Sequence, residues 1–465
     1  MKICRILIAN RGEIAVRIIR TCCILGIETV LAASEADMSS VPARMADRTI
    51  CIGPPKSGDS YLNVDAIIGA AIEAKADAIH PGYGFLSENV RLARACAVRG
   101  ITFIGPTEMQ LEAVGDKLRA RGHAIDAGLP VVPGGSVNSS ADAAAVAKKV
   151  GWPILVKAVG GGGGRGMKLV SEPKRLLETV ALAMAEADAA FADSRVYLER
   201  FVSSGRHIEV QIIGDGNNVI HLGDRDCSVQ RRYQKLIEEA PAPDLPAKTS
   251  AAMRNAAVAF GRHLKYRGLG TIEFLYDRER DEFYFLEMNA RIQVEHPVTE
   301  AITGLDLVAE QIAIAEGQKL RLRQDDIIFN GHAIECRLNA EDWTHDFRPA
   351  PGTVDAAIFP AGAGVRVDTH IEAGSGVPPF YDSLLAKVIV HDADRTMVIH
   401  RLRLAMSDCD IRGVATNRDM HLAVLSQPDF VRGAVDTAYF QRFLDCRNSS
   451  QDMRPKGPMD PALPV

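Results

Sequence analysis

Short apolar runs alternate with amphipathic stretches over the first 115 residues, and this alternation limits the possible folds more than any other feature of the sequence. Buried strands are predicted at CRILIA, IETVLAAS, DAIHPG and ITFIG, and helices at GEIAVRIIRTCCILG, YLNVDAIIGAAIEAKA and ENVRLARACAVRG. Strands that alternate with helices in this way predict a parallel sheet with helices on both faces. Ligands bind such sheets at the carboxyl ends of the strands, so the loops NRGE and HPGYGFLSEN, each directly after a strand, are candidate site loops.

Length and charge set further limits. The chain has 465 residues, more than a single hydrophobic core accommodates, so several domains are expected. A net charge of −5 and a pI near 6.2 argue against nucleic acid or an anionic membrane as the main partner. No apolar run reaches the roughly 18 residues of a membrane span, and the N-terminus lacks the pattern of a signal peptide. The nine cysteines are scattered without a CxxC pair, which favours a cytoplasmic protein with reduced thiols over a zinc or disulfide protein.

The pattern changes after the first unit. Residues 130–203 combine a helix, two strand-like runs around a set of glycines, a long helix and another strand, which indicates a second unit. Strand patterns dominate from residue 204 onward. Residues 449–465 contain four prolines and no apolar period, so we expect a disordered tail there.

Five consecutive glycines, Gly160–Gly164, lie between two apolar stretches in VKAVGGGGGRGMKLV. A P-loop requires lysine and then serine or threonine after its last glycine, and a dinucleotide-binding loop requires a helix after it, and the sequence meets neither condition. We therefore expect a hairpin whose glycine loop closes over phosphate oxygens through its backbone N–H groups, with Lys157 adding a positive charge. A flexible linker is the alternative.

The segment GTIEFLYDRERDEFYFLEMNARIQVEH carries the strongest local chemistry. From Phe283 the sequence alternates, and its polar positions are Glu287, Asn289, Arg291, Gln293 and Glu295, while its apolar positions are Tyr284, Leu286, Met288, Ala290, Ile292 and Val294. The turn signal DRERDE predicts a hairpin, and a turn near residue 280 brings Glu273 directly opposite Glu287. Facing like charges destabilise a sheet unless a cation binds them, and Mg²⁺ commonly takes one or two carboxylates. Asn289 offers a further oxygen; a solvated strand face is the alternative reading.

Several other charged residues are weaker candidates. Lys117 lies at a predicted helix start, and His207 and Glu209 share one face of a strand. A charged segment contains Arg225, Gln230, Arg231, Arg232, Tyr233 and Lys235, each of which alone is more typical of a protein surface. Arg337 is the better candidate, because it falls within an apolar strand and a buried arginine needs a partner.

The order and spacing of the longer motifs resemble those of the biotin carboxylases, a family with the ATP-grasp fold. The matching stretches are ANRGEIAVRI, HPGYGFLSEN, FIGP, GDK, VKAVGGGGGRGM, RDCSVQRR, EEAPAP, EMNARIQVEHPVTE, ECRLNAED and TN near residue 416. The resemblance covers residues 1–446. It implies α/β and α+β architecture, with an N-terminal doubly wound parallel sheet, an ATP-grasp domain with a mobile glycine-rich lid, and a C-terminal mixed, β-rich domain. The implied domains are 1–115, 116–203 (lid), 204–330 (catalytic ATP-grasp part), 331–448 (C-terminal) and 449–465 (tail).

The resemblance implies an ATP-dependent ligase that carboxylates N1′ of biotin from bicarbonate through carboxyphosphate, the first half-reaction of a biotin-dependent carboxylase. It implies ATP and Mg²⁺ or Mn²⁺ as cofactors, with biotin as a carrier-bound substrate. Implied partners are a biotin carboxyl carrier protein and carboxyltransferase subunits, with a homodimeric enzyme of the acetyl-CoA or acyl-CoA carboxylase type that serves fatty acid biosynthesis. The chain lacks an AMKM biotinylation motif, so biotin is expected to arrive on another protein.

Site residues carry over from the family motif by motif. The implied nucleotide contacts are Lys117, Lys157, Gly163, Gly164, Glu199, Arg200, Phe201, Val202, His207 and Tyr233. The implied metal ligands are Glu273, Glu287 and Asn289. The implied bicarbonate and biotin contacts are Lys235, Arg291, Gln293, Val294, Arg337 and Tyr83. Glu295 matches the general base on bicarbonate, and Arg337 matches the residue that stabilises the biotin enolate.

Two positions depart from the family pattern. Tyr233 stands where bacterial members have a histidine that reaches the nucleotide phosphates, and tyrosine carries no charge at neutral pH. Ile24 stands where an acidic residue supports a dimer contact in some members, so that ion pair is not expected here. Two other functions remain open from the residues: an ATP-grasp ligase that joins a carboxylate to an amine, and an ATP-binding homologue without catalysis.

Overall fold

The computed structural model describes residues 2–137, 139–159, 167–191 and 193–452. Gly163 and Gly164, the expected nucleotide contacts of the glycine run, therefore lie outside the described residues, as do residues 453–465. The last described helix, α15, spans Tyr439–Asp452. The prediction of disorder from residue 449 is thus wrong for its first four residues, which continue this helix.

The N-terminal region contains the predicted parallel sheet. Its strand order is β3-β2-β1-β4-β5, and every pairing is parallel. The strands are β1 (Arg5–Ile8), β2 (Glu28–Ala33), β3 (Arg48–Cys51), β4 (Ala78–His80) and β5 (Thr102–Phe103), and the helices include α1 (Gly12–Leu25), α3 (Val64–Ala74) and α4 (Val90–Val98). The sequence analysis missed β3, an edge strand with a single buried residue, because such a strand has no apolar run.

The two predicted site loops meet where the strand order reverses. β1 and β4 are neighbours, and the chain leaves β1 toward β2 on one side and returns to β4 on the other. The Asn10 side-chain amide donates hydrogen bonds of 2.7 Å each to the carbonyl oxygens of Pro81 and Tyr83. The loop after β1 therefore fixes the loop after β4 at a switch point, where open α/β sheets bind their ligands.

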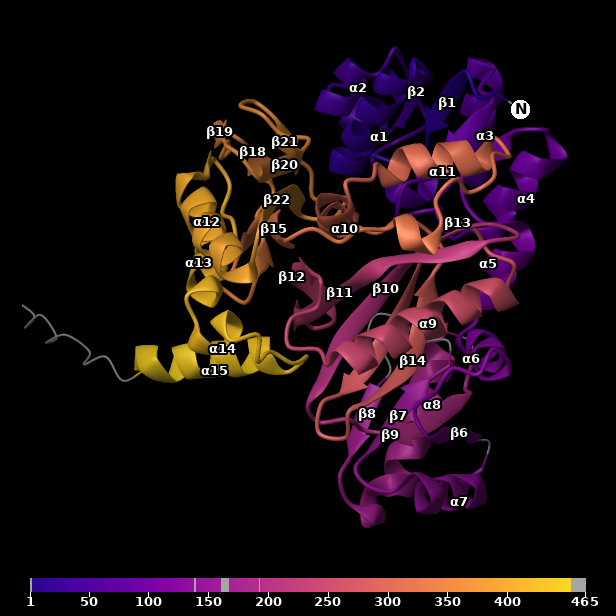
Figure 1. Cartoon of the computed structure of the whole chain (residues 1–465), viewed down its shortest axis with the longest axis vertical. Helices are drawn as coiled ribbons and strands as arrows, with labels where there is room; N and C mark the ends of the chain where they lie inside the picture. The colour runs from indigo at the N-terminus through magenta and orange to yellow at the C-terminus, as the bar shows by residue number, and fades with distance from the viewer. Residues whose placement is uncertain (1, 138, 160–166, 192, 453–465) are drawn as a thin grey trace, which may run out of the picture.

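A smaller antiparallel sheet holds the strands on either side of the glycine run. Its order is β6-β9-β7-β8, with the strands β6 (Gly134–Val137), β7 (Ile154–Ala158), β8 (Met167–Val170) and β9 (Val196–Arg200). Lys157 on β7 pairs with Met167 on β8, which confirms the predicted hairpin for the two strands that the structure describes. Helices α7 (Ser140–Val150) and α8 (Leu176–Phe191) pack against this sheet and enclose a separate hydrophobic core (Figure 1).

One eight-stranded antiparallel sheet carries the candidate site. Its order is β14-β13-β10-β11-β12-β15-β22-β20. The strands are β10 (Gly205–Asp215), β11 (Val219–Arg231), β12 (Gln234–Ala240), β13 (Arg267–Asp277), β14 (Glu282–Asn289), β15 (His332–Asn339), β20 (Val365–Thr369) and β22 (Leu384–Asp392). β12 pairs with β15, so this sheet continues across residue 330, where the sequence analysis drew a domain boundary.

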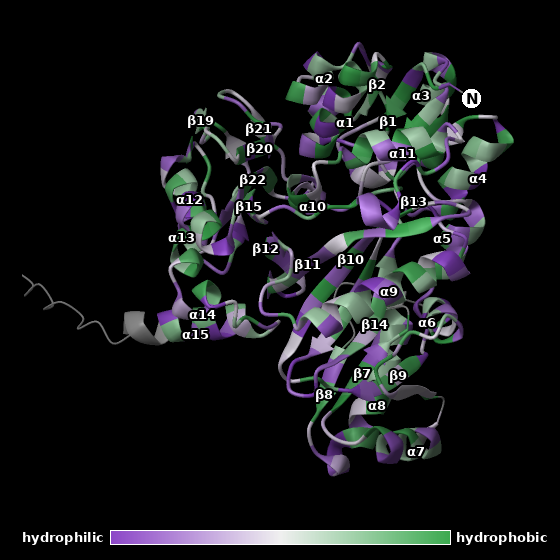
Figure 2. Ribbon diagram, in the orientation of Figure 1, coloured by the Kyte–Doolittle hydropathy of each residue, from purple (hydrophilic) through white to green (hydrophobic). Residues whose placement is uncertain are grey.

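The remaining elements cover these sheets (Figure 1). They are η1 (Glu35–Asp37), α2 (Val41–Met45), η2 (Ser57–Asp59), α5 (Glu108–Gly115), α6 (Lys117–Asp126), η3 (Pro173–Arg175), α9 (Ala247–His263), α10 (His296–Thr303), α11 (Leu307–Ala315), η4 (Gln324–Asp326), β16 (Glu341–Asp342), β17 (Arg348–Pro349), β18 (Gly352–Thr353), β19 (Ala356–Ile358), β21 (Gly376–Val377), α12 (Arg395–Asp408), β23 (Asp410–Arg412), α13 (Arg418–Leu425) and α14 (Pro428–Val431). Surface helices such as α7 and α12 carry both hydrophobic and hydrophilic residues, as amphipathic helices do (Figure 2).

The strand-dominated prediction after residue 204 missed α9 and α12. Within the described ranges, no helix has both the length and the hydropathy needed to cross a membrane.

Candidate active site

Lys235, on β12, is the centre of the candidate site. Its ammonium group lies 2.6 Å from a carboxylate oxygen of Glu209, 3.0 Å from Glu273 and 2.7 Å from Glu295. Burial alone would lower the lysine pKa, but the three carboxylates outweigh it and hold the pKa well above its usual value. Lys235 is therefore a permanent cation that ties β10, β13 and the start of α10 to β12.

Glu273 and Glu287 face each other across β13 and β14, as the sequence predicted. Repulsion by Glu273, together with burial, raises the pKa of Glu287. The amide nitrogen of Asn289 donates a 2.9 Å hydrogen bond to Glu273, and the amide oxygen accepts a 2.6 Å bond from Arg291. Two opposed carboxylates fit Mg²⁺ or Mn²⁺, and a bound ion would remove the repulsion that raises the Glu287 pKa.

The strand that carries Glu287 differs from the prediction in two ways. The register shifts between Glu273 and Phe274, so Leu286 is an extra residue in β14 and Tyr284 lies on the same face as Glu287 instead of on the core face. β14 also ends at Asn289, so residues 291–295 form a loop before α10 instead of continuing the strand. Alternation of residue types indicates strand character but contains no signal for a bulge or for the strand end.

The loop 291–295 is held in place by hydrogen bonds of Arg291, Gln293, Val294 and Glu295. Arg291 donates hydrogen bonds to Glu88 (2.9 Å) and to Asn289 (2.6 Å). Gln293 accepts a 2.7 Å bond from Arg225 and donates a 3.2 Å bond to Glu273. The Val294 carbonyl accepts a 2.8 Å bond from Lys387, and Glu295 accepts its bond from Lys235. The residues expected to bind bicarbonate are thus held by a network of hydrogen bonds.

Arg337, on β15, has the partners that its apolar strand implied. Its guanidinium lies 2.5 Å from Glu238 and 2.9 Å from Glu295. Burial of Glu295 would raise the pKa of that carboxyl, but Lys235 and Arg337 outweigh burial and hold the Glu295 pKa well below its usual value. Glu295 is therefore ionised at neutral pH.

The backbone of Arg337 is also fixed by a buried histidine. His421 contacts the Arg337 carbonyl oxygen at 2.7 Å, and Asn417 donates to the same oxygen at 3.0 Å. Both side chains are fully buried. Burial lowers the His421 pKa to about 4.

This low pKa predicts acid sensitivity. Between pH 6.5 and about 4 the unfolded chain binds a proton at residue 421 that the folded chain does not, so stability falls as the pH falls through this window. The full contribution is about 3 kcal/mol. We expect His421→Gln, which keeps a donor to the Arg337 carbonyl, to lose less stability than the parent between pH 7 and pH 5 in urea denaturation. Equal losses in both proteins would contradict this assignment.

The expected nucleotide residues border the same sheet from the smaller domain. Lys157 forms an ion pair with Glu199, and the Arg200 guanidinium contacts the Tyr284 hydroxyl. Val202 packs with Tyr284 in a small hydrophobic cluster, and the Phe201 amide donates to the Pro153 carbonyl at 3.0 Å.

Two further nucleotide candidates lie close to the oxygen donors. His207 lies 3.0 Å from Glu273; burial lowers its pKa, but the carboxylate outweighs burial and raises it overall. Lys117 is the first residue of α6, as predicted; burial lowers its pKa, whereas Glu287 acts to raise it. Both groups are therefore coupled electrostatically to the proposed metal ligands.

Tyr233 lies two residues before Lys235, and Tyr83 lies in the loop after β4. Arg232 and Tyr233, both with positive φ, form the tight turn between β11 and β12, and Tyr233 is 58% exposed. The Tyr83 hydroxyl donates to Glu13, and Glu13 lies 3.1 Å from the Lys387 ammonium. Tyr83 is thereby connected through two side chains to the loop 291–295.

Arg225 and Lys387 are two buried cations whose importance the sequence analysis missed. Arg225 is fully buried and donates to Glu209 (2.5 Å), Gln293, Gln211 and two threonines. It was grouped with surface residues, although it lies on β11 near the middle of the sheet. Lys387 lies in an apolar strand, LLAKVIV, so the argument that selected Arg337 would have found it. Arg225 lies between Asp224 and Asp226 in LGDRDCSV, and that argument does not select it.

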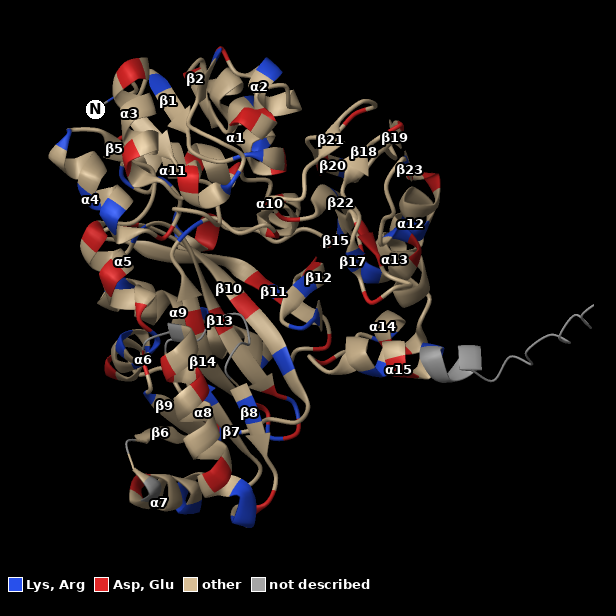
Figure 3. Cartoon of the chain, turned by 180° about the vertical axis from the view of Figure 1, so that it is seen from behind, with Lys and Arg blue, Asp and Glu red and all other residues tan. Residues whose placement is uncertain are grey.

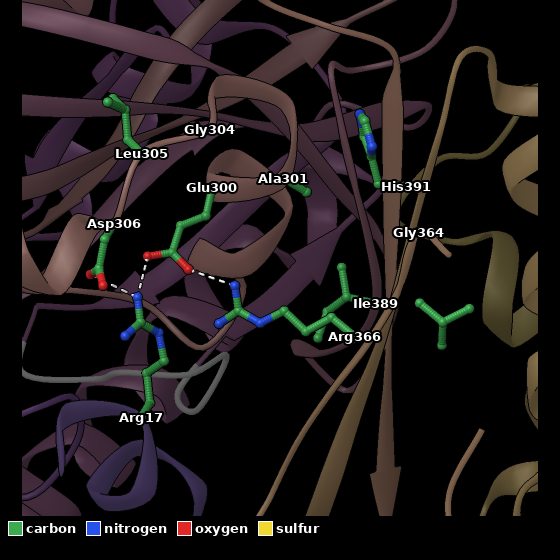
Figure 4. A pocket seen from close by; sticks show the side chains of 11 residues that line it. Arg17, Glu300, Ala301, Gly304, Leu305, Asp306, Gly364, Arg366, Ile389 and His391 are labelled. Carbon is green, nitrogen blue, oxygen red and sulfur yellow. Dashed lines mark hydrogen bonds and ion pairs between the residues drawn. The ribbon is translucent and has the colours of Figure 1, made fainter. Parts of the chain in front are cut away.

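A cavity of about 410 Å³ lies apart from this cluster, between α1, α10 and β20 (Figure 4). Its charged residues are paired with each other: Arg17 contacts Glu300 at 2.7 Å and Asp306 at 2.8 Å, and Arg366 contacts Glu300 at 2.7 Å. Acidic and basic residues are interspersed across all parts of the chain (Figure 3).

Three family models match the chain, and together they cover most of it. Residues 2–111 match "Biotin carboxylase, N-terminal domain", residues 116–323 match "Carbamoyl-phosphate synthase L chain, ATP binding domain", and residues 335–442 match "Biotin carboxylase C-terminal domain". Among curated relatives, the biotin carboxylase of Nostoc sp. is 50% identical over 95% of this chain and 99% of its own length. That of Pseudomonas aeruginosa is 48% identical over 95% of this chain and 98% of its own length.

Solved structures agree with this relationship. Biotin carboxylase of Campylobacter jejuni, in a complex with a β,γ-ATP ligand, superimposes with a TM-score of 0.91 at 45% identity, covering 95% of this chain and 99% of that one. The biotin carboxylase domain dimer of Hydrogenobacter thermophilus 2-oxoglutarate carboxylase, with MgADP, ADP and bicarbonate, gives 0.90 at 43% identity and covers 96% and 98%. The chain belongs to the biotin carboxylase family.

Proposed function

We propose that this protein uses ATP and bicarbonate to carboxylate N1′ of biotin, the first half-reaction of a biotin-dependent carboxylase. The observation that carries the proposal is the cluster in which Glu295 is buried between the cations Lys235 and Arg337. An ionised carboxylate can accept the proton of bicarbonate when the bicarbonate lies within hydrogen-bond reach. The names of the relatives and the bicarbonate in one similar structure support the same reaction.

The residues around Glu295 suggest how the substrates bind. Arg291, Lys235 and Gln293 supply donors for a planar anion, and the Val294 backbone lies beside them, which suits bicarbonate and then carboxyphosphate. Phosphoryl transfer gathers negative charge, and fixed cations such as Lys235 offset it without reorganisation. Arg337 is placed to balance the negative charge on the biotin oxygen once N1′ is deprotonated.

The nucleotide and metal residues surround this centre. We assign ATP to Lys117, Lys157, Gly163, Gly164, Glu199, Arg200, Phe201, Val202, His207 and Tyr233, and the biotin side of the site to Tyr83. Glu273, Glu287 and Asn289 would hold Mg²⁺ or Mn²⁺, which when bound neutralises phosphate charge. A water-excluding lid formed by the glycine run would protect carboxyphosphate from hydrolysis.

The partners follow from the chemistry. Biotin is supplied by a biotin carboxyl carrier protein, and the carboxyl group then passes to a carboxyltransferase. The biotin carboxylase domain dimer of Hydrogenobacter thermophilus supports a homodimer, in which Ile24, 81% exposed on α1, would replace the acidic contact. We place the enzyme in the cytoplasm.

The proposal is tested by measuring ADP release with ATP, Mg²⁺, bicarbonate and free biotin. We expect release to require bicarbonate and to rise with biotin. Turnover with an amine in place of biotin would instead support a carboxylate–amine ligase. ATP binding in calorimetry without turnover would identify a non-catalytic homologue.

Tyr233 gives a graded prediction. A histidine at this exposed turn can add a charge-assisted hydrogen bond to phosphate, which a neutral tyrosine cannot. We expect Tyr233→His to lower the KM for ATP about threefold to tenfold, in line with about 1 kcal/mol per hydrogen bond, with little change in kcat. Tyr233→Phe is the control for the hydroxyl alone. An unchanged KM in Tyr233→His would remove residue 233 from the nucleotide site.

A further inference from the structure

Two histidines meet on the surface where α6 lies beside α9, away from the Lys235 cluster (Figure 1). His123 is in the last turn of α6, and His263 is the last residue of α9. Their ring nitrogens, Nδ1 of His123 and Nε2 of His263, are 3.2 Å apart. The ring planes are tilted by 57° with centroids 5.4 Å apart, so the rings meet through their nitrogen edges and are not stacked.

A carboxylate completes this cluster. Asp126 follows His123 by three residues on α6, a spacing that puts both side chains on one face of the helix. One ligand atom from each of His123, Asp126 and His263 lies within 4.8 Å of the other two. Asp126 and His263 are exposed and His123 is half-buried, so an ion and its remaining water ligands have direct access from solvent.

The separation of the two nitrogens matches that of two ligands on one metal ion. In a tetrahedral zinc site with Zn–N bonds of about 2.0–2.1 Å, two nitrogens are separated by about 3.3–3.4 Å. Imidazole nitrogen suits Zn²⁺, Cu²⁺, Ni²⁺ and Co²⁺, whereas Mg²⁺ prefers an all-oxygen set such as Glu273 and Glu287. The surface cluster and the Glu273–Glu287 pair therefore favour different ions.

We propose that His123, Asp126 and His263 form a site for a divalent transition-metal ion of the Zn²⁺ class. The ion joins the last turn of α6 to the last turn of α9, with water in the remaining coordination positions. α6 begins at Lys117, so the ion fixes the far end of the helix that carries an assigned ATP contact. An ion that binds only the folded protein also raises the apparent stability of the protein.

The test uses the full chain, stripped of metal and then kept in excess MgCl₂ and ADP so that the Glu273–Glu287 region holds Mg²⁺. Titration with CoCl₂ should produce visible d–d absorption bands that saturate at a single site, and ZnCl₂ should displace the cobalt. His263→Gln and Asp126→Asn change exposed side chains, so both variants are expected to fold. Each should weaken cobalt binding more than tenfold and reduce the rise in melting temperature that zinc produces.

A control variant separates this site from general histidine binding. His400 is an exposed histidine on α12, and His400→Gln should bind cobalt with the affinity of the parent chain. Equal cobalt affinity in the parent and in His263→Gln would overturn the proposal. The contact between His123 and His263 would then be only a hydrogen bond between the two rings. Competition of the cobalt by Mg²⁺ would also overturn it, because that result places the ion on the oxygen ligands.

Discussion

Glu295→Gln is expected to lower kcat for biotin-dependent ADP release by a factor of about 10²–10⁴, the usual contribution of a positioned general base. The glutamine has nearly the same shape and can still accept a hydrogen bond from Lys235, but it cannot take a proton from bicarbonate. The change also removes one of the three carboxylates around Lys235. The result is read from steady-state kinetics with ATP, bicarbonate and biotin varied in turn.

Two measurements make this result specific. ADP affinity, measured by calorimetry, should change little, because Glu295 lies with the bicarbonate residues. Glu279→Gln, an exposed residue in the turn between β13 and β14, should keep the parent kcat. A Glu295→Gln enzyme with parent-like kcat would show that another group accepts the proton.

Lys387→Met is expected to have the largest effect on stability. Lys387 is fully buried on β22, and its ammonium lies 2.8 Å from the Val294 carbonyl, 3.1 Å from Glu13 and 3.9 Å from Asp368. Removing one partner of a buried ion pair leaves the other charge uncompensated, which costs about 3–5 kcal/mol. The midpoint of urea denaturation should therefore fall markedly.

The same substitution tests how the loop 291–295 is positioned. Without Lys387 the Val294 carbonyl loses its donor, so the KM for bicarbonate should rise more than the KM for ATP. Lys387→Met combined with Glu13→Gln removes both charges and should recover part of the lost stability. A single variant with an unchanged denaturation midpoint, or a double variant less stable than the single one, would contradict this role for Lys387.

The sequence predicted the parts of the fold that depend on local patterns. The parallel sheet followed from alternating strands and helices. The predicted opposition of Glu273 and Glu287 is present, but it depends on the bulge at Leu286, because the turn itself pairs Asp277 with Glu282. The prediction failed where alternation carries no signal, at the bulge at Leu286 and at the end of β14.

The candidate site shows a second limit. A charged residue within an apolar strand, such as Arg337, indicates that its side chain is buried and needs a partner of opposite charge. Which partner is chosen depends on strand order, and no local pattern encodes that β12 lies between β11 and β15. The contacts of Lys235 with Glu209 and of Arg337 with Glu238 needed the three-dimensional structure, because they join residues of different strands.

The most direct test of the account is to identify the product. The chain is incubated with ATP, Mg²⁺, free biotin and isotope-labelled bicarbonate, and the biotin is analysed by mass spectrometry under conditions that preserve carboxybiotin. We predict labelled N1′-carboxybiotin in the parent protein and its loss in Glu295→Gln. Hydrolysis of ATP without any labelled carboxybiotin would contradict the proposed function.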